Sequence, residues 1–134
     1  MNITINGVEL QGDLMDADFI GPYEEATKHM LAESQMCKAK HYDTVAASYL
    51  EQCQVVDRYF DQVFGEGTAA RVFQGKEHNV MTHLQAVEQL TNWAYQEKKK
   101  FNDFTNKYTQ RQNAKMQRDR AQQIIAAKKN GGSQ

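Results

Sequence analysis

The residues with the greatest potential for chemistry are two cysteines and four histidines. Cys37 and His41 are four residues apart, so on a continuous helix both would face the same side, as two metal ligands can. A metal site needs a second pair, and His78 and His83 are five apart, which places them on different faces of a helix. We therefore expect buried or free thiols, exposed imidazoles, and no bound metal or cofactor.

The acidic residues do not form an obvious catalytic arrangement. Glu51, Asp57, Asp61 and Glu88 fall on the polar faces of expected helices, where carboxylates are solvated. The segment 65–67, Gly-Glu-Gly, lacks the GK[ST] of a phosphate-binding loop, and no Ser-His-Asp signature is visible. Because acid–base catalysis needs convergent groups in a pocket, we expect a binding protein and not an enzyme.

Basic and aromatic residues near the C-terminus form the most informative pattern. The basic residues recur every three or four positions, as on one stripe of a helix, and aromatic residues are interleaved with them. Such a helix could bind nucleic acid through phosphate contacts and stacking. The aromatic residues also share the spacing of an apolar core stripe, so docking against a helix of another protein fits better. The candidate partner-binding residues are Trp93, Phe101, Phe104, Lys107, Tyr108, Arg111, Lys115, Met116 and Arg118.

Charge is distributed unevenly along the 134 residues. The net charge is −1, but residues 1–95 carry 6 Lys and Arg against 14 Asp and Glu, a net charge of −8. Residues 96–134 carry 10 against 3, a net charge of +7. An acidic body followed by a basic arm is typical of an interaction segment. We expect a helical body over 1–95 and a basic helical arm over 96–134, frayed from residue 130.

Elements that could position these residues follow from periodicity. Asn6-Gly7, flanked by alternating apolar residues, predicts a β-hairpin over residues 2–10. Helices are predicted from a start between Asp18 and Pro22 to residue 39, from an Asp43 cap to residue 64, over 69–73 with Thr68 as cap, and from residue 79 onward. The expected fold is mainly α: a small helical bundle with an N-terminal β-hairpin and a long C-terminal helix.

Apolar residues at helical spacing give the expected core faces. The first helix contributes Phe19, Tyr23, Ala26, Met30 and Cys37. The second contributes Val45, Tyr49, Cys53, Val56, Phe60, Val63 and Phe64. The last long helix contributes Val80, Leu84, Val87, Leu90 and Ala94. The N-terminus lacks the features of a signal peptide, and no apolar run approaches the ~20 residues of a membrane span, so we expect a cytoplasmic location.

Residues 57–90 carry a resemblance to a known group of proteins. Their middle, FDQVFGEGTAARVF, resembles a segment of small proteins encoded in tail-gene clusters of phages and prophages of Gram-positive bacteria. ITINGVEL followed by DADFIGPYEEA is similar to the same group, and the resemblance covers roughly residues 1–95. It implies a tail assembly chaperone: a small helical cytoplasmic protein that coats the tape-measure protein, recruits tail-tube subunits and is absent from the virion.

Other functions fit the same residues. One alternative is a small phage-encoded inhibitor of a host or defence factor, with the basic arm contacting nucleic acid or an acidic protein face. Another is a structural virion component such as a connector. Self-association fits every version, because the hairpin has an open strand edge and the arm could pack against a second copy.

Overall fold

The computed structural model describes residues 2–132, with side chains described for residues 2–128. The chain divides into two compact units, a first unit (Met1–Glu97) and a second unit (Lys98–Gln134). The predicted fold class is confirmed, since a short hairpin precedes a mainly helical chain that ends in its longest helix. Among the described residues, no helix is both long enough and apolar enough to cross a membrane. The elements are β1 (Asn2–Ile5), β2 (Val8–Gln11), α1 (Ala17–Ala39), α2 (Val45–Phe64), α3 (Thr68–Val72) and α4 (Val80–Gly132).

The hairpin forms where the turn dipeptide predicts it. Asn6 has φ 51° and Gly7 has φ 79°, the left-handed values that a two-residue type I′ turn requires at both positions. β1 and β2 pair antiparallel, and the alternation places Ile3, Ile5 and Leu10 on one buried face. The hairpin is thereby one wall of the core.

The start of α1 differs slightly from the prediction. Asp16 is the N-cap, because its Oδ1 accepts a hydrogen bond from the N–H of Asp18 at 2.9 Å, and the helix begins at Ala17. Because the helix begins before the predicted range, Pro22 lies in the second turn, where it removes an intrahelical donor. The predicted apolar face is confirmed, with Phe19 and Met30 half-buried and three residues buried: Tyr23, Ala26 and Cys37.

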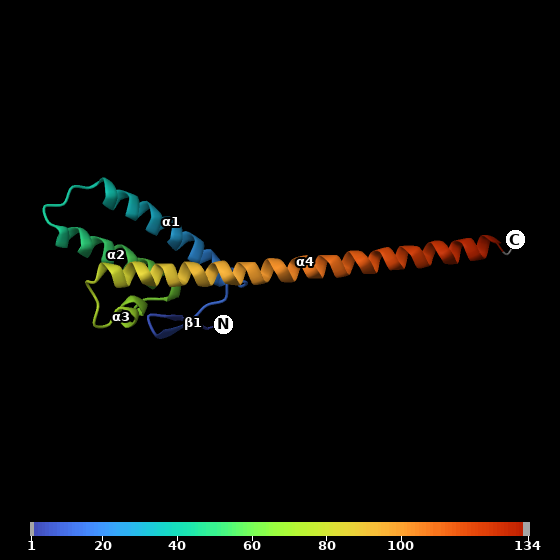
Figure 1. Ribbon diagram of the computed structural model, residues 1–134, viewed down its shortest axis with the longest axis horizontal. Coiled ribbons are helices and arrows are strands. Elements are labelled where there is room, and N and C mark those ends of the chain that lie inside the picture. The colour runs from blue at the N-terminus through green and yellow to red at the C-terminus, as the bar shows by residue number, and fades with distance from the viewer. Residues whose placement is uncertain (1, 133–134) are drawn as a thin grey trace. The chain divides into compact units, whose positions relative to one another are not determined.

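α2 runs antiparallel to α1 after the connection at residues 40–44 (Figure 1). Its N-cap is Thr44, whose Oγ1 accepts from the N–H of Ala47 at 3.1 Å, and the predicted Asp43 cap was wrong by one residue. The predicted stripe was also wrong at its beginning, because Val45 is 66% exposed and Tyr49 is 46% exposed. The buried side chains of α2 begin at its third turn, so its first two turns do not pack into the core.

α3 is capped by a side chain from α2. The Oδ1 of Asp61 accepts from the N–H of Ala69 at 2.8 Å, which satisfies a donor at the start of α3. Thr68 is therefore not the cap that the sequence predicts; it is buried and its hydroxyl donates to the carbonyl of Gly65 at 2.7 Å. Asp61 was expected on a solvated face and instead has a structural role.

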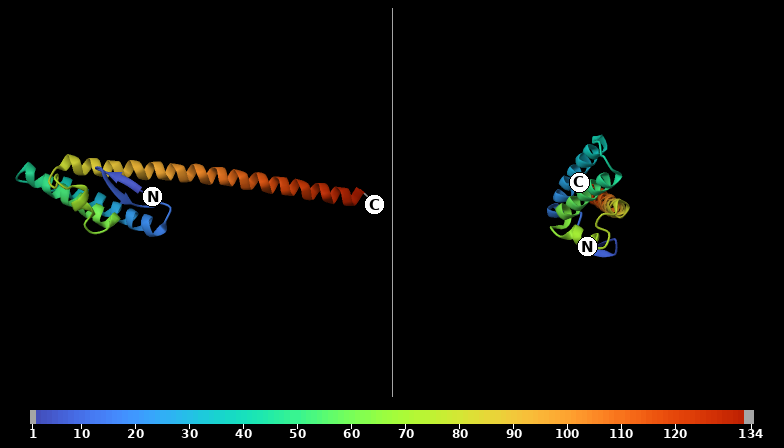
Figure 2. Two further views of the ribbon diagram at one scale, coloured as in Figure 1. Left: turned by 90° about the horizontal axis from the view of Figure 1, so that it is seen from below. Right: turned by 90° about the vertical axis from the view of Figure 1, so that its left-hand side faces the viewer.

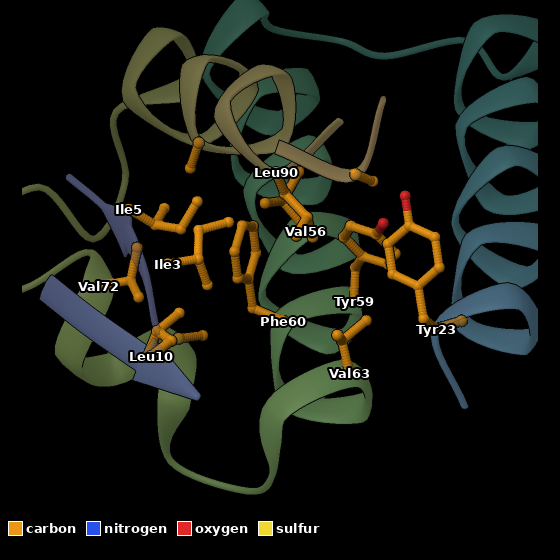
Figure 3. Packing of buried hydrophobic residues seen from close by; sticks show 14 of the residues in the cluster. Ile3, Ile5, Leu10, Tyr23, Val56, Tyr59, Phe60, Val63, Val72 and Leu90 are labelled. Atoms are coloured by element: carbon orange, nitrogen blue, oxygen red, sulfur yellow. The ribbon is translucent and has the colours of Figure 1, made fainter. Parts of the chain in front are cut away.

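The core of the first unit lies between the hairpin, α1, α2, α3 and the first part of α4 (Figure 3). Phe60 is its centre, with no exposed surface, and Leu90 of α4 is equally buried. Figure 3 shows Ile3 and Leu10 of the hairpin pointing toward Phe60. This burial fixes which face of α4 the first unit uses.

The buried face of α4 is shifted from the predicted one. His83 and Ala86 have no exposed surface, whereas Leu84, predicted in the core, is 47% exposed. The prediction is confirmed for Leu90 and Ala94, and Val80 and Val87 are half-buried. His83, Ala86, Leu90 and Ala94 follow spacings of three, four and four residues, so they form one helical stripe.

α4 supplies the helical residues of the second unit (Figure 2). The chain has no Gly or Pro between residues 76 and 130, and the helix continues through Gly131 and Gly132. The fraying predicted from residue 130 is thus absent as far as Gly132, while Ser133 and Gln134 lie outside the described residues. Every described side chain of the second unit is exposed except Thr105, which is half-buried.

Candidate partner-binding surface

Three aromatic residues of the second unit form what we call the aromatic triad: Phe101, Phe104 and Tyr108. Their spacings of three and four residues place them on one face of α4. Phe101 is 47% exposed, Phe104 62% and Tyr108 53%. The rings of Phe104 and Tyr108 stack with centroids 6.3 Å apart and planes inclined by 15°. The triad is therefore an ordered apolar surface that the described side chains of its own unit leave accessible.

Four basic residues follow, which we call the cationic stripe: Lys107, Arg111, Lys115 and Arg118. All four are exposed. No ion pair among the described side chains involves any of them. Their charges are thus available to an external partner. Consecutive residues are separated by about 1.5 Å along the helix axis, which sets the spacing of these charges.

The other predicted binding residues have different surroundings. Met116 directly follows Lys115 in the second unit and is 62% exposed. Trp93 belongs to the first unit, where it is half-buried and meets the ring of Phe19 edge-on at 6.2 Å. Trp93 therefore has a packing role in the first unit in addition to any contact it makes with a partner.

The first unit contains a cleft of about 550 Å³ between α1, α2 and the start of α4. At its edge Glu51 accepts hydrogen bonds from Cys37 Sγ at 3.6 Å and from Lys40 Nζ at 3.1 Å. The Lys40 ammonium holds the pKa of the Glu51 carboxyl below its usual value. Glu51 was predicted on a solvated face and is instead half-buried and paired. A carboxylate held ionised in this way suits a structural ion pair better than proton transfer.

A second carboxylate that was predicted to be solvated, Asp57, binds a buried histidine. His83 Nε2 lies 2.9 Å from Asp57 Oδ1, and His83 Nδ1 lies 2.7 Å from the carbonyl oxygen of Asn79. The imidazole also stacks on Phe73, with ring centroids 3.7 Å apart. His83 was expected to be exposed, and that prediction was wrong. Helical spacing to Ala86 and Leu90 is the signal that could have placed it in the core.

The metal-ligand geometry considered from the sequence does not form. α1 ends at Ala39, so His41 lies outside the helix that carries Cys37 and instead pairs with Asp43 at 3.5 Å. Among the described residues, no three His, Cys, Asp or Glu side chains are grouped to hold a metal ion. Both cysteines are buried and free, and desolvation raises the pKa of the Cys53 thiol.

The sequence profile of a family described as "Family of unknown function (DUF6673)" matches residues 6–123, which is most of the chain. No curated protein and no solved structure matches this chain. The match extends through the aromatic triad and the cationic stripe.

Proposed function

Since this chain belongs to the DUF6673 family, a family of unknown function, we propose its function from its own exposed surface. It binds an apolar helical segment of another protein, as a phage tail assembly chaperone binds the tape-measure protein. The observation that carries the proposal is the exposure of three aromatic side chains on one face of the second unit: Phe101, Phe104 and Tyr108. Contiguous exposed apolar surface is typical of interaction sites.

The energetics favour a partner for this surface. Full burial of a large apolar side chain contributes roughly 1.5–3 kcal/mol, so covering three partly exposed aromatic rings contributes a few kcal/mol. An isolated helix is marginally stable in water, and most helical stability comes from packing of an apolar face. A partner helix laid along the triad would supply that packing in the helix-in-groove mode, with anchors at spacings of three and four residues.

Chaperone action is supported by two further features. Residues 57–90 resemble small tail-cluster proteins, and this segment contains the end of α2, all of α3 and the start of α4. A chaperone that coats an apolar helix also needs side chains that adapt to irregular surfaces. Methionine has this property, and Met36, Met81 and Met116 are all more than 60% exposed. Tape-measure protein is the proposed main partner, and tail-tube protein is the proposed second one.

Co-expression with the tape-measure protein of the same genome tests the proposal. The wild-type chain should keep the tape-measure protein in the supernatant after lysis. A triad variant, F101A/F104A/Y108A, should lose this effect. The matched control N106A/Q110A/N113A changes three residues on the opposite face of the same helix and should retain it. Equal precipitation with and without the wild-type chain would refute the proposal.

Nucleic acid is the second candidate partner, and the exposed cationic stripe favours it. Binding through phosphate contacts should weaken steeply as the salt concentration rises. A single-stranded oligonucleotide would also stack on exposed aromatic rings. Electrophoretic mobility shifts at low and physiological salt would detect this binding, and the absence of a shift at low salt would refute it.

A further inference from the structure

One face of the second unit changes its chemistry along the helix. Starting at Phe101, the aromatic triad and then Arg111, Lys115 and Arg118 follow spacings of three, four, three, four and three residues. This pattern keeps all six side chains on one face of α4. The face is apolar in its first half and cationic in its second half, and all six side chains are exposed.

A second copy of the same face is a poor partner for it. Residues 96–134 carry a net charge of +7, so pairing two copies brings together like charges. In an antiparallel pair the rings of one copy could meet the cations of the other, but exposed cation–π contacts are weak. The aromatic half needs apolar side chains opposite it, and the cationic half needs carboxylates.

We infer that the partner segment is an amphipathic helix whose contact face is apolar over about two turns and acidic over the next two. This inference rests on the proposed function and specifies the chemistry of its partner. Aspartate or glutamate residues spaced three and four apart would face Arg111, Lys115 and Arg118. The apolar residues supply most of the affinity, and the carboxylates supply selectivity and register.

Synthetic helical peptides test the inference with the full-length protein. Each labelled peptide has leucines on one half of its contact face and either glutamates or lysines on the other half. Both orders of the two halves are made, because the partner can run parallel or antiparallel to α4. Fluorescence anisotropy measures the dissociation constant of each peptide at low and at physiological salt.

For one order of the two halves, the wild-type protein should bind the glutamate peptide at least about tenfold more tightly than the matching lysine peptide. The preference should shrink as salt increases. Equal affinity of the wild-type protein for the glutamate and lysine peptides, in both orders, would overturn the inference. This measurement uses only the wild-type protein, so it does not depend on the folding of a variant. A single-stranded oligonucleotide that binds more tightly than the glutamate peptides, and displaces them, overturns it in favour of nucleic acid.

Charge reversal locates the selectivity on the face. The variant R111E/K115E/R118E should prefer the lysine peptide. A matched control, K99E/R120E/K128E, makes the same change in net charge away from this face and should still prefer the glutamate peptide. Loss of the preference in both variants alike would show a long-range charge effect and overturn the inference. Circular dichroism checks that both variants keep their helices.

The inference and the proposed function can fail separately. A chain that keeps the tape-measure protein in solution but shows no glutamate preference refutes only the acidic requirement. A chain that prefers the glutamate peptide but fails to keep the tape-measure protein in solution refutes the chaperone function and leaves the partner chemistry intact.

Discussion

His83 Nε2 lies 2.9 Å from Asp57 Oδ1, which links the start of α4 to the middle of α2 inside the first unit. The carbonyl of Asn79 can only accept, so His83 Nδ1 donates to it at 2.7 Å. One further proton must lie between His83 Nε2 and Asp57. The pair therefore satisfies a fully buried imidazole at both nitrogens, and it fixes α4 against α2.

The Asp57 carboxyl predicts a specific pH dependence. Its pKa is raised, chiefly by desolvation and also by the nearby charge of Asp61, although the charge and hydrogen bond of His83 act in the opposite direction. An acid with a raised pKa in the folded state stabilises the fold most below its unfolded pKa, and the contribution is lost as pH rises through the folded pKa. Asp57→Asn removes this titration and keeps a side chain that can donate to a neutral imidazole.

Urea unfolding of wild type and Asp57→Asn between pH 4 and pH 7 measures this effect. The free energy of unfolding of the variant should improve relative to wild type as pH rises. Carboxylates that do not interact with Asp57 titrate alike in both proteins and cancel in the difference. A difference that is constant across this range would contradict the assigned pKa direction.

Gly12 and Gly21 give opposite predictions for the same substitution. A Cβ at Gly12 would lie 2.6 Å from Cζ of Phe19, whereas a Cβ at Gly21 meets nothing within 4 Å. Gly12→Ala should therefore lower the free energy of unfolding by about 1–3 kcal/mol through overpacking. Gly21→Ala lies inside α1 and should raise it by about 0.5–1 kcal/mol. Urea unfolding followed by Trp93 fluorescence measures both, and equal effects would contradict the close approach of Gly12 to Phe19.

The aromatic triad should contribute little to the stability of the first unit. The variant F101A/F104A/Y108A should change the free energy of unfolding reported by Trp93 by less than about 0.5 kcal/mol, because these side chains are exposed. Phe60→Ala, in the centre of the core, should cost about 3–5 kcal/mol. A large loss in the triad variant would show that the rings pack in the folded monomer and are not available to a partner.

Local signals in the sequence predicted most of the fold. The dipeptide Asn6-Gly7 was sufficient to predict the hairpin, because its tight turn requires residues that tolerate positive φ. The predicted end of the second helix at residue 64 is confirmed, and Gly65 is the C-cap of α2. The helix starts were less accurate, because adjacent polar residues such as Asp43 and Thr44 can both cap and the local sequence does not decide between them.

Long-range pairing was not predictable from the same signals. Asp57 and His83 are 26 residues apart. Helical spacing could have placed His83 in the core, but no local signal indicates that Asp57 is its partner. Their partnership depends on the packing of α4 against α2, which no local pattern specifies. The prediction that Val45 lies in the core was wrong for a related reason. Periodicity shows which face of a helix is apolar, but not how far along the helix that face is covered by other elements.

Site-specific photocrosslinking during co-expression tests the central claim most directly. A photoreactive phenylalanine analogue replaces Phe104 in one variant and Lys99, on another face of the same helix, in the control. We predict a covalent product with the tape-measure protein from position 104 and little or none from position 99. Equal products from both positions, or tape-measure protein kept in solution with no crosslink from position 104, would contradict binding through the aromatic triad.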